Sequence, residues 1–254
     1  MKTTRKFYSF TSLAAFHDAV HRLDDTHGPG FLGCTRDEAD ARRYSYPEAV
    51  AALAALPELS TPITSGQFAK TWTDYDGDDM DVERFQDGRP FLSRRIRETG
   101  RRARHVQTIL VNITEGAAVK ARDMLWKAYA AARLVDQLES TGTRCEVFAV
   151  CHARGTFTNG NDYAAQIMLK GPDEPLDLAA LAAAFTPWTL RRFVFGHMDT
   201  VGRCKPGKGY ALTWPQELIP LGAIVIETGD CLTRTSAADM IRTTTANHQA
   251  ALAA

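Results

Sequence analysis

The sequence has no long apolar run and no excess of charge of either sign. Its 254 residues include 30 lysines and arginines against 30 aspartates and glutamates, so the formal net charge is zero. This balance argues against a basic coat for nucleic acid. No stretch of about 18 apolar residues is present, which argues against a membrane partner. The opening MKTTRKFYSF is basic but no apolar segment follows it, so we expect a cytoplasmic protein without a signal peptide.

Metal-binding and catalytic motifs are also missing. The five cysteines are scattered without a Cys-x-x-Cys pair, which indicates reduced thiols, and we expect Cys145 and Cys151 to pack in the core. His17 and His21 have zinc-ligand spacing on a helix but no third ligand, so we expect them at the surface. There is no Gly-x-Ser-x-Gly and no Gly-x-Gly-x-x-Gly after a predicted strand. No catalytic residue is predicted, and an enzyme is the less favoured class of function.

The sequence does contain an alternation of strand and helix patterns. Residues 106–113 are a short β-branched run, residues 115–140 are amphipathic at helical spacing, and residues 145–151 are a second apolar run. This order predicts two parallel strands joined by a right-handed crossover. Further strands are expected at 163–171, 190–198 and 222–228, and further helices at 176–185 and 236–252. The predicted fold class is α/β, with a doubly wound and mostly parallel sheet.

Composition divides the chain into three regions. They are a small helical N-terminal region (1–60), an acidic and basic connector rich in turns (61–103) and the α/β domain (104–254). In the first region, Ser12 is placed to cap a helix and Pro47 to begin another. Thr35 and Glu38 have the spacing of a capping box.

Polar residues follow two of the predicted strands, where ligands of open α/β sheets bind. One strand ends in Asn112-Ile113-Thr114-Glu115-Gly116, and another runs into Thr228-Gly229-Asp230. The first stretch resembles the Asp-x-Ser-x-Ser signature of von Willebrand factor A-type domains, with Asn112, Thr114 and Gly116 at the ligand positions. The second is similar to the strand-end Thr-Asp-Gly of that family, with the last two residues exchanged.

This resemblance implies a degenerate metal-dependent adhesion site. Its Mg²⁺ ligands would be Asn112, Thr114, Glu115 and Asp230, with the carboxylates supplying the charge that Asn112 lacks. The residues also support a simpler interpretation, which we favour, in which Asn112, Thr114 and Gly116 cap a helix that begins near Gly116. A-type domains often act beside a ring-shaped ATPase, so the resemblance implies protein partners, with such an ATPase as a candidate.

A second resemblance extends over roughly residues 8–230. Its motifs are residues 81–90 (DVERFQDGRP), the strand and helix that begin at 107, and residues 187–195 (PWTLRRFVF). In this order the features are similar to a family of uncharacterised proteins encoded by bacteriophages and plasmids. The resemblance implies a mobile-element origin, a bacterial host cell and an A-like adhesion or scaffold fold. Our first hypothesis is therefore a non-enzymatic protein-interaction or scaffold module.

An arginine run that begins in the connector and ends at the first residue of the α/β domain gives an alternative function. It consists of Arg94, Arg95, Arg97, Arg101, Arg102 and Arg104. Guanidinium groups bind phosphates, so this run predicts contact with nucleic acid or another anion. The other interpretation is a solvated linker that faces the acidic run at 74–83. That acidic run does not match an EF-hand, because Asp79 and Phe85 stand where Gly and Glu are required.

A glycine-rich loop gives a second alternative, an enzyme with an unrecognised motif. Residues 202–208 match the first seven positions of a phosphate-binding loop, with Gly207 and Lys208 as nucleotide-binding candidates. Gly209 stands where Ser or Thr should hold Mg²⁺, and an extended segment follows instead of a helix. A flexible basic loop is the favoured interpretation.

Overall fold

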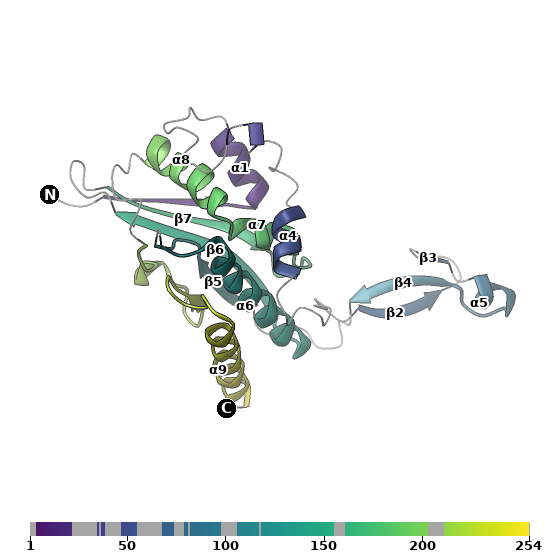
Figure 1. Ribbon diagram of the computed structural model, residues 1–254. Coiled ribbons are helices and arrows are strands. Elements are labelled where there is room, and N and C mark those ends of the chain that lie inside the picture. Colours follow the sequence, from purple (N-terminus) through teal and green to yellow (C-terminus); the bar gives the residue numbers. More distant parts are fainter. Residues whose placement is uncertain are drawn as a thin grey trace.

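The body of the protein is built on a five-stranded sheet with the strand order β1-β7-β6-β5-β8 (Figure 1). The computed structural model describes residues 4–21, 35, 37–38, 47–54, 68–73, 79–80, 82–97, 106–116, 118–154, 161–202 and 211–253. The strands are β1 (Thr4–Phe10), β5 (Val106–Asn112), β6 (Arg144–Arg154), β7 (Asn161–Lys170) and β8 (Ile224–Ile226). Only β6 and β7 pair antiparallel among these neighbours. The prediction of an α/β fold with a mostly parallel sheet is confirmed.

Strands β5 and β6 and the helix between them, α6 (Ala121–Ser140), form the predicted βαβ unit. The helix begins at Ala121, and its N-cap residue Lys120 makes no side-chain cap. The interpretation of Asn112, Thr114 and Gly116 as caps of a helix beginning near Gly116 is therefore wrong. The physical reason is that Asn112 and Thr114 hydrogen-bond to each other and to other strand-end groups, several residues before the first helical turn.

The C-terminal end of α6 is fixed by Gly142, a residue type that commonly ends helices. Gly142 has φ 89°, its N–H donates to the Glu139 carbonyl at 3.0 Å, and the Thr143 N–H donates to the Leu138 carbonyl at 3.1 Å. This pair of bonds is a Schellman motif, which satisfies the last carbonyls of the helix and directs the chain into β6.

The helices gather on one face of the sheet. On that face Ile109 and Val147 pack in a large cluster with α6, α7 (Leu178–Ala184) and α9 (Arg234–Ala253). On the other face, Leu110 and Val150 pack against residues of the segment 211–223, which contains only the short 3₁₀ helix η3 (Gln216–Leu218). A doubly wound sheet carries helices on both faces. In the described residues, α-helices cover only one face of this sheet. The antiparallel return of β7 explains this, because such a pair needs no crossover helix.

The described parts of the N-terminal region belong to the same body. Its first strand, β1, pairs with β7, and the helices α1 (Leu13–His21) and α4 (Pro47–Ala54) pack in the main cluster. Ser12 Oγ accepts a hydrogen bond from the Ala15 N–H at 3.0 Å, as its predicted capping role requires. The predicted capping box also forms, because Thr35 N–H donates to Glu38 Oε2 and Glu38 N–H donates to Thr35 Oγ1. Sequence analysis missed β1, whose partner strand lies far along the chain.

Residues 190–198, predicted as a strand, are helical. They lie in two π-helical segments, η1 (Thr189–Val194) and η2 (Met198–Gly202), joined by α8 (Phe195–His197). The buried Leu190, Phe193, Val194 and Met198 recur at steps of three and four residues, which is helical spacing. None of the described helices is long and apolar enough to cross a membrane.

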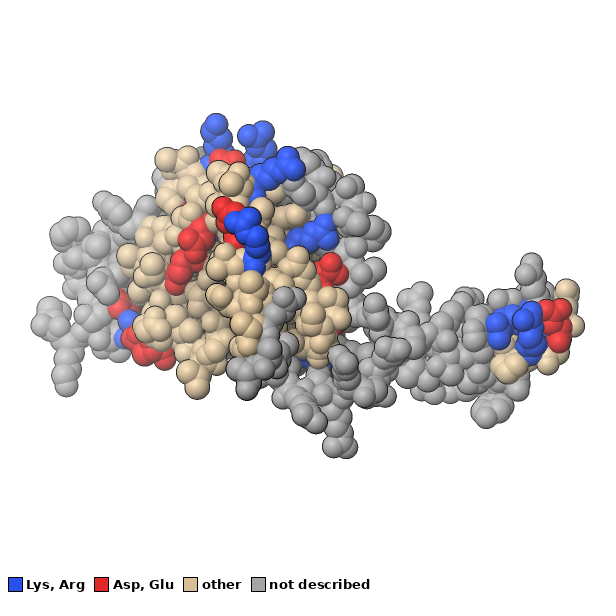
Figure 2. Space-filling view, turned by 90° about the horizontal axis from the view of Figure 1, so that it is seen from below, with Lys and Arg blue, Asp and Glu red and all other residues tan. Residues whose placement is uncertain are grey.

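A second, three-stranded sheet forms an arm that projects from the body in Figure 1. Its elements are β2 (Phe68–Thr73), β3 (Asp79–Met80), α5 (Val82–Gln86) and β4 (Leu92–Arg97). A turn forms at Asp87-Gly88, with φ 64° at Gly88. Phe85 and Phe91 pack edge to face with ring centroids 4.8 Å apart. Figure 2 shows basic and acidic side chains side by side at the tip, where Arg89 pairs with Asp87.

Candidate strand-end binding site

Polar side chains meet at the carboxyl ends of β5 and β8. The Asn112 amide group donates to the Leu212 carbonyl at 2.8 Å and to Glu227 Oε2 at 2.9 Å. Its carbonyl Oδ1 accepts from the Thr114 N–H at 2.9 Å and from the Thr114 hydroxyl at 2.5 Å. Asn112 therefore ties its own loop to β8 and to the segment that covers the sheet edge.

A buried lysine lies beneath these strand ends. The Lys127 ammonium, on α6, forms an ion pair with Glu115 and donates to the Asn112 backbone carbonyl at 2.8 Å. The Lys127 side chain is 1% exposed and the Glu115 side chain 4%. Burial lowers the pKa of Lys127, while the Glu115 carboxylate acts in the opposite direction and favours the ammonium. The pair therefore places a compensated charge inside the strand-end region.

The loop after β8 completes the arrangement. Glu115 accepts hydrogen bonds from the Gly229 N–H at 3.1 Å and from the Thr228 hydroxyl at 3.4 Å. Asp230 Oδ2 accepts from the Glu227 N–H at 2.8 Å. We call the connected side chains the strand-end network: Asn112, Thr114, Glu115, Lys127, Glu227 and Asp230. The structure thus brings together all four residues predicted from the two strand-end motifs.

A strap, residues 211–217, crosses this edge of the sheet and ends within the 3₁₀ helix η3. Its Leu212 carbonyl accepts from Asn112, its Thr213 carbonyl lies 2.9 Å from His152 Nδ1, and its Trp214 N–H donates to Glu227 at 2.9 Å. At its far end Glu217 pairs with Arg5 of β1. The backbone of the strap therefore hydrogen-bonds to strand-end polar groups that an external ligand would otherwise contact.

Sequence analysis missed Lys127 and Glu227. Lys127 carries a signal in the sequence, because it falls among the buried positions Met124, Ala131 and Leu134 of an amphipathic helix. A charged residue on an apolar helix face needs a buried partner. Glu227 directly follows the last residue of β8, and only the register of β8 beside β5 reveals that it meets Asn112.

The predicted magnesium site is not tested by these contacts and stays a prediction. Within the described ranges, no three His, Cys, Asp or Glu side chains form a group that could hold a metal ion. Glu115 is already paired with Lys127, and Asn112 Oδ1 already accepts two hydrogen bonds from Thr114.

The other predicted sites lie elsewhere. Arg94, Arg95 and Arg97 lie on β4 of the arm, away from the strand-end network. Three further arginines and the loop candidates fall outside the described residues: Arg101, Arg102, Arg104, Gly207 and Lys208.

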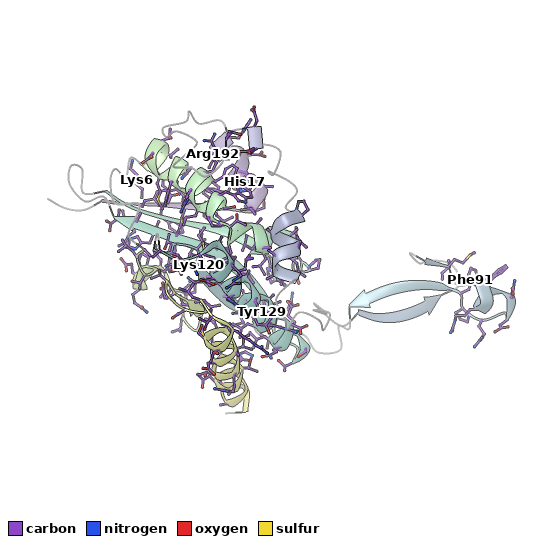
Figure 3. All side chains as sticks on the ribbon, viewed as in Figure 1. Lys6, His17, Phe91, Lys120, Tyr129 and Arg192 are labelled. Atoms are coloured by element: carbon purple, nitrogen blue, oxygen red, sulfur yellow. The ribbon has the colours of Figure 1, made fainter. Side chains whose placement is uncertain are left out.

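Buried histidines and cysteines belong to the core. His17, expected at the surface, is fully buried on α1 and stacks on the Phe193 ring, with centroids 4.0 Å apart (Figure 3 labels His17). Cys145 and Cys151 pack in the core as predicted, and burial raises the pKa of each thiol to about 12. Burial also lowers the pKa of His197 to about 4. At neutral pH these thiols stay protonated and this imidazole stays neutral.

The chain matches a known family model. A family model described as "Domain of unknown function (DUF7192)" matches residues 2–250. No curated protein matches the chain, and no solved structure does.

Proposed function

The chain belongs to the DUF7192 family of unknown function, and we propose from its own geometry that it is a non-enzymatic protein-interaction module. Its binding surface is the strand-end edge of the sheet, formed by the strap, the loop after β8 and the network beneath them. The protein acts by presenting this surface to another protein, as a scaffold component.

The proposal rests on one observation: the polar groups at the strand ends make hydrogen bonds and an ion pair with one another. Asn112, Glu115 and Glu227 each make at least two contacts within the network, to the strap or to the loop after β8. An enzyme needs a nucleophile, a base or oriented donors that a substrate can reach. Groups that are joined by hydrogen bonds and an ion pair instead keep the surface above them in a fixed shape. A preorganised surface lowers the entropic cost of binding a partner.

The A-like character of the domain is part of the proposal. Its support is that the two motifs with the A-type resemblance, at Asn112 and at Thr228, lie at the ends of the neighbouring parallel strands β5 and β8. There the Thr228 hydroxyl donates to Glu115. The resemblance makes a ring-shaped ATPase a candidate partner. The mobile-element origin and the cytoplasmic location stay predictions of the sequence.

The experiment is affinity capture with a bulky substitution on the surface. Thr213 is exposed, and its backbone carbonyl lies 2.9 Å from His152 Nδ1, a side chain outside the network. Thr213→Arg should therefore block the surface while the hydrogen bonds of the network remain. Ala238→Arg, at an exposed position of α9, is the matched control. We expect partner capture to fall at least tenfold for Thr213→Arg and to be unchanged for the control. Equal partner capture by both variants would show that the strand-end surface does not bind the partner.

The arm favours a second candidate function, binding of nucleic acid. β2 and β4 form an antiparallel ribbon in which Lys70 lies opposite Arg95 and Thr71 opposite Arg94. A two-stranded ribbon fits the major groove of duplex DNA, and basic residues on it neutralise phosphates.

This candidate predicts a steep salt dependence. Reversing the charge of Arg94, Arg95 and Arg97 together should abolish retention of a DNA duplex, and binding to the wild-type protein should weaken strongly as salt rises. Arg242→Glu on the exposed side of α9 is the control. Retention that is unchanged in the triple variant would exclude the arm as a nucleic-acid site.

A further inference from the structure

We propose that the Lys127 ammonium is the resident cation of the strand-end site. It supplies from within the chain the positive charge that a divalent metal supplies in the A-type domains that the sequence resembles. This inference concerns how the site is built, and it holds whether or not the surface above it binds a protein.

The position of the ammonium is the first argument. Lys127 Nζ contacts the Glu115 carboxylate and lies 2.8 Å from the Asn112 backbone carbonyl oxygen. A carboxylate and a carbonyl are the hard oxygen ligands that Mg²⁺ prefers. The ammonium therefore sits where these two oxygens converge, directly beneath the motif that resembles a metal signature.

Charge compensation is the second argument. The Glu115 carboxylate is almost fully buried, and a buried carboxylate without a cation is strongly unfavourable. Asp230 adds further negative charge and, like Glu115, acts to raise the pKa of Lys127. A divalent ion bound to Glu115 would lie beside a buried ammonium, and the repulsion between the two cations would oppose its binding. The residues present therefore do not fit a divalent metal ion in addition to the Lys127 ammonium.

The anchoring of the lysine is the third argument. Lys127 belongs to α6, whose flanking Trp126 and Ala128 are buried in the main cluster. A cation on a packed helix cannot dissociate, so the strand-end network keeps its shape at any concentration of metal or chelator. The substitution of Asn for the leading Asp of the signature agrees with this, because a single ammonium balances fewer carboxylates than a divalent ion.

The test is a titration with Mn²⁺, which serves as a spectroscopic probe for a Mg²⁺-type site. Four proteins are compared: the wild type, Glu115→Gln, Lys127→Ala and Lys127→Ala combined with Glu115→Gln. Electron paramagnetic resonance of free Mn²⁺ reports binding. We expect no stoichiometric binding to the wild type, one ion bound per chain of Lys127→Ala with a rise in its melting temperature, and loss of both effects in the double variant.

Two results would overturn the proposal. One is stoichiometric Mn²⁺ binding to the wild type that Glu115→Gln abolishes, since the lysine and a metal would then share the site. The other is a folded Lys127→Ala variant that takes up no Mn²⁺.

A second measurement applies if Lys127→Ala does not fold. Lys127→Met leaves the Glu115 charge uncompensated, whereas Lys127→Met with Glu115→Gln removes both charges. The proposal predicts that the double variant melts at a higher temperature than Lys127→Met alone. A double variant that melts no higher than Lys127→Met would show that Lys127 does not compensate Glu115.

Discussion

At the scale of single residues, the protein is distinguished by charged and polar side chains placed deep in its core. Lys127 pairs with Glu115 near the N-terminal end of α6, and Lys170 pairs with Glu139 near its C-terminal end, at 2.7 Å. Each ammonium also donates to a backbone carbonyl, of Asn112 and Cys145 respectively. Such pairs fix a particular arrangement, because loss of one partner leaves the other charge buried and uncompensated.

His197 gives a prediction about pH. Its Nδ1 lies 2.7 Å from the buried Tyr163 hydroxyl, Tyr8 and Phe10 pack on the ring, and burial lowers its pKa from 6.5 to about 4. Between these values the unfolded chain binds more protons than the folded chain, so acid favours unfolding. The stability that the neutral His197 contributes is fully present above pH 6.5 and is lost as the pH falls to 4. The loss amounts to about 3 kcal/mol of the free energy of unfolding.

The check is urea unfolding at several pH values between 7 and about 4. His197→Gln keeps a hydrogen-bonding group beside Tyr163 but does not titrate, so its stability should fall less steeply with acid than that of the wild type. Identical pH profiles for the two proteins would mean that His197 is not the titrating group.

At the scale of elements, local signals in the sequence predict the elements whose stability is local. The βαβ unit, the capping box at Thr35 and the stop at Gly142 follow from hydrophobic spacing and from turn and capping residues. The segment 190–198 was misread because Phe193, Val194 and Phe195 form a short apolar run, which a strand and a buried helix share. Strand β1 was missed because only its pairing with the distant β7 makes it a strand.

Gly142 gives a prediction at this scale. An added Cβ at Gly142 meets no atom within 4 Å, but the residue has φ 89°, which alanine adopts only with strain. Gly142→Ala should therefore lower the free energy of unfolding by about 1 kcal/mol. Gly116→Ala, equally open but without the positive φ, is the control and should be close to neutral. Chemical denaturation of the two variants measures the difference, and equal stabilities would contradict the role of the Schellman motif.

At the scale of the whole molecule, the candidate site is only partly predictable from sequence. The strand-end motifs identify Asn112, Thr114, Glu115 and Asp230, because the ends of parallel strands share one edge of a sheet. The helical spacing marks Lys127 as a buried charge, but its oxygen partners and the position of the strap depend on long-range packing, which no local pattern encodes. The same packing gives the site its own cation and covers the edge with the strap, and these features favour a binding surface over a reaction centre.

The most direct test is affinity capture of the tagged protein from the cells that encode it, carried out in parallel without additions, after nuclease treatment, and with EDTA. The account predicts that a discrete protein partner is retained under both treatments, because the contact is between proteins and Lys127 makes the site independent of metal. Loss of the partner on nuclease treatment, with recovery of nucleic acid in its absence, would contradict the account and assign the function to the arm.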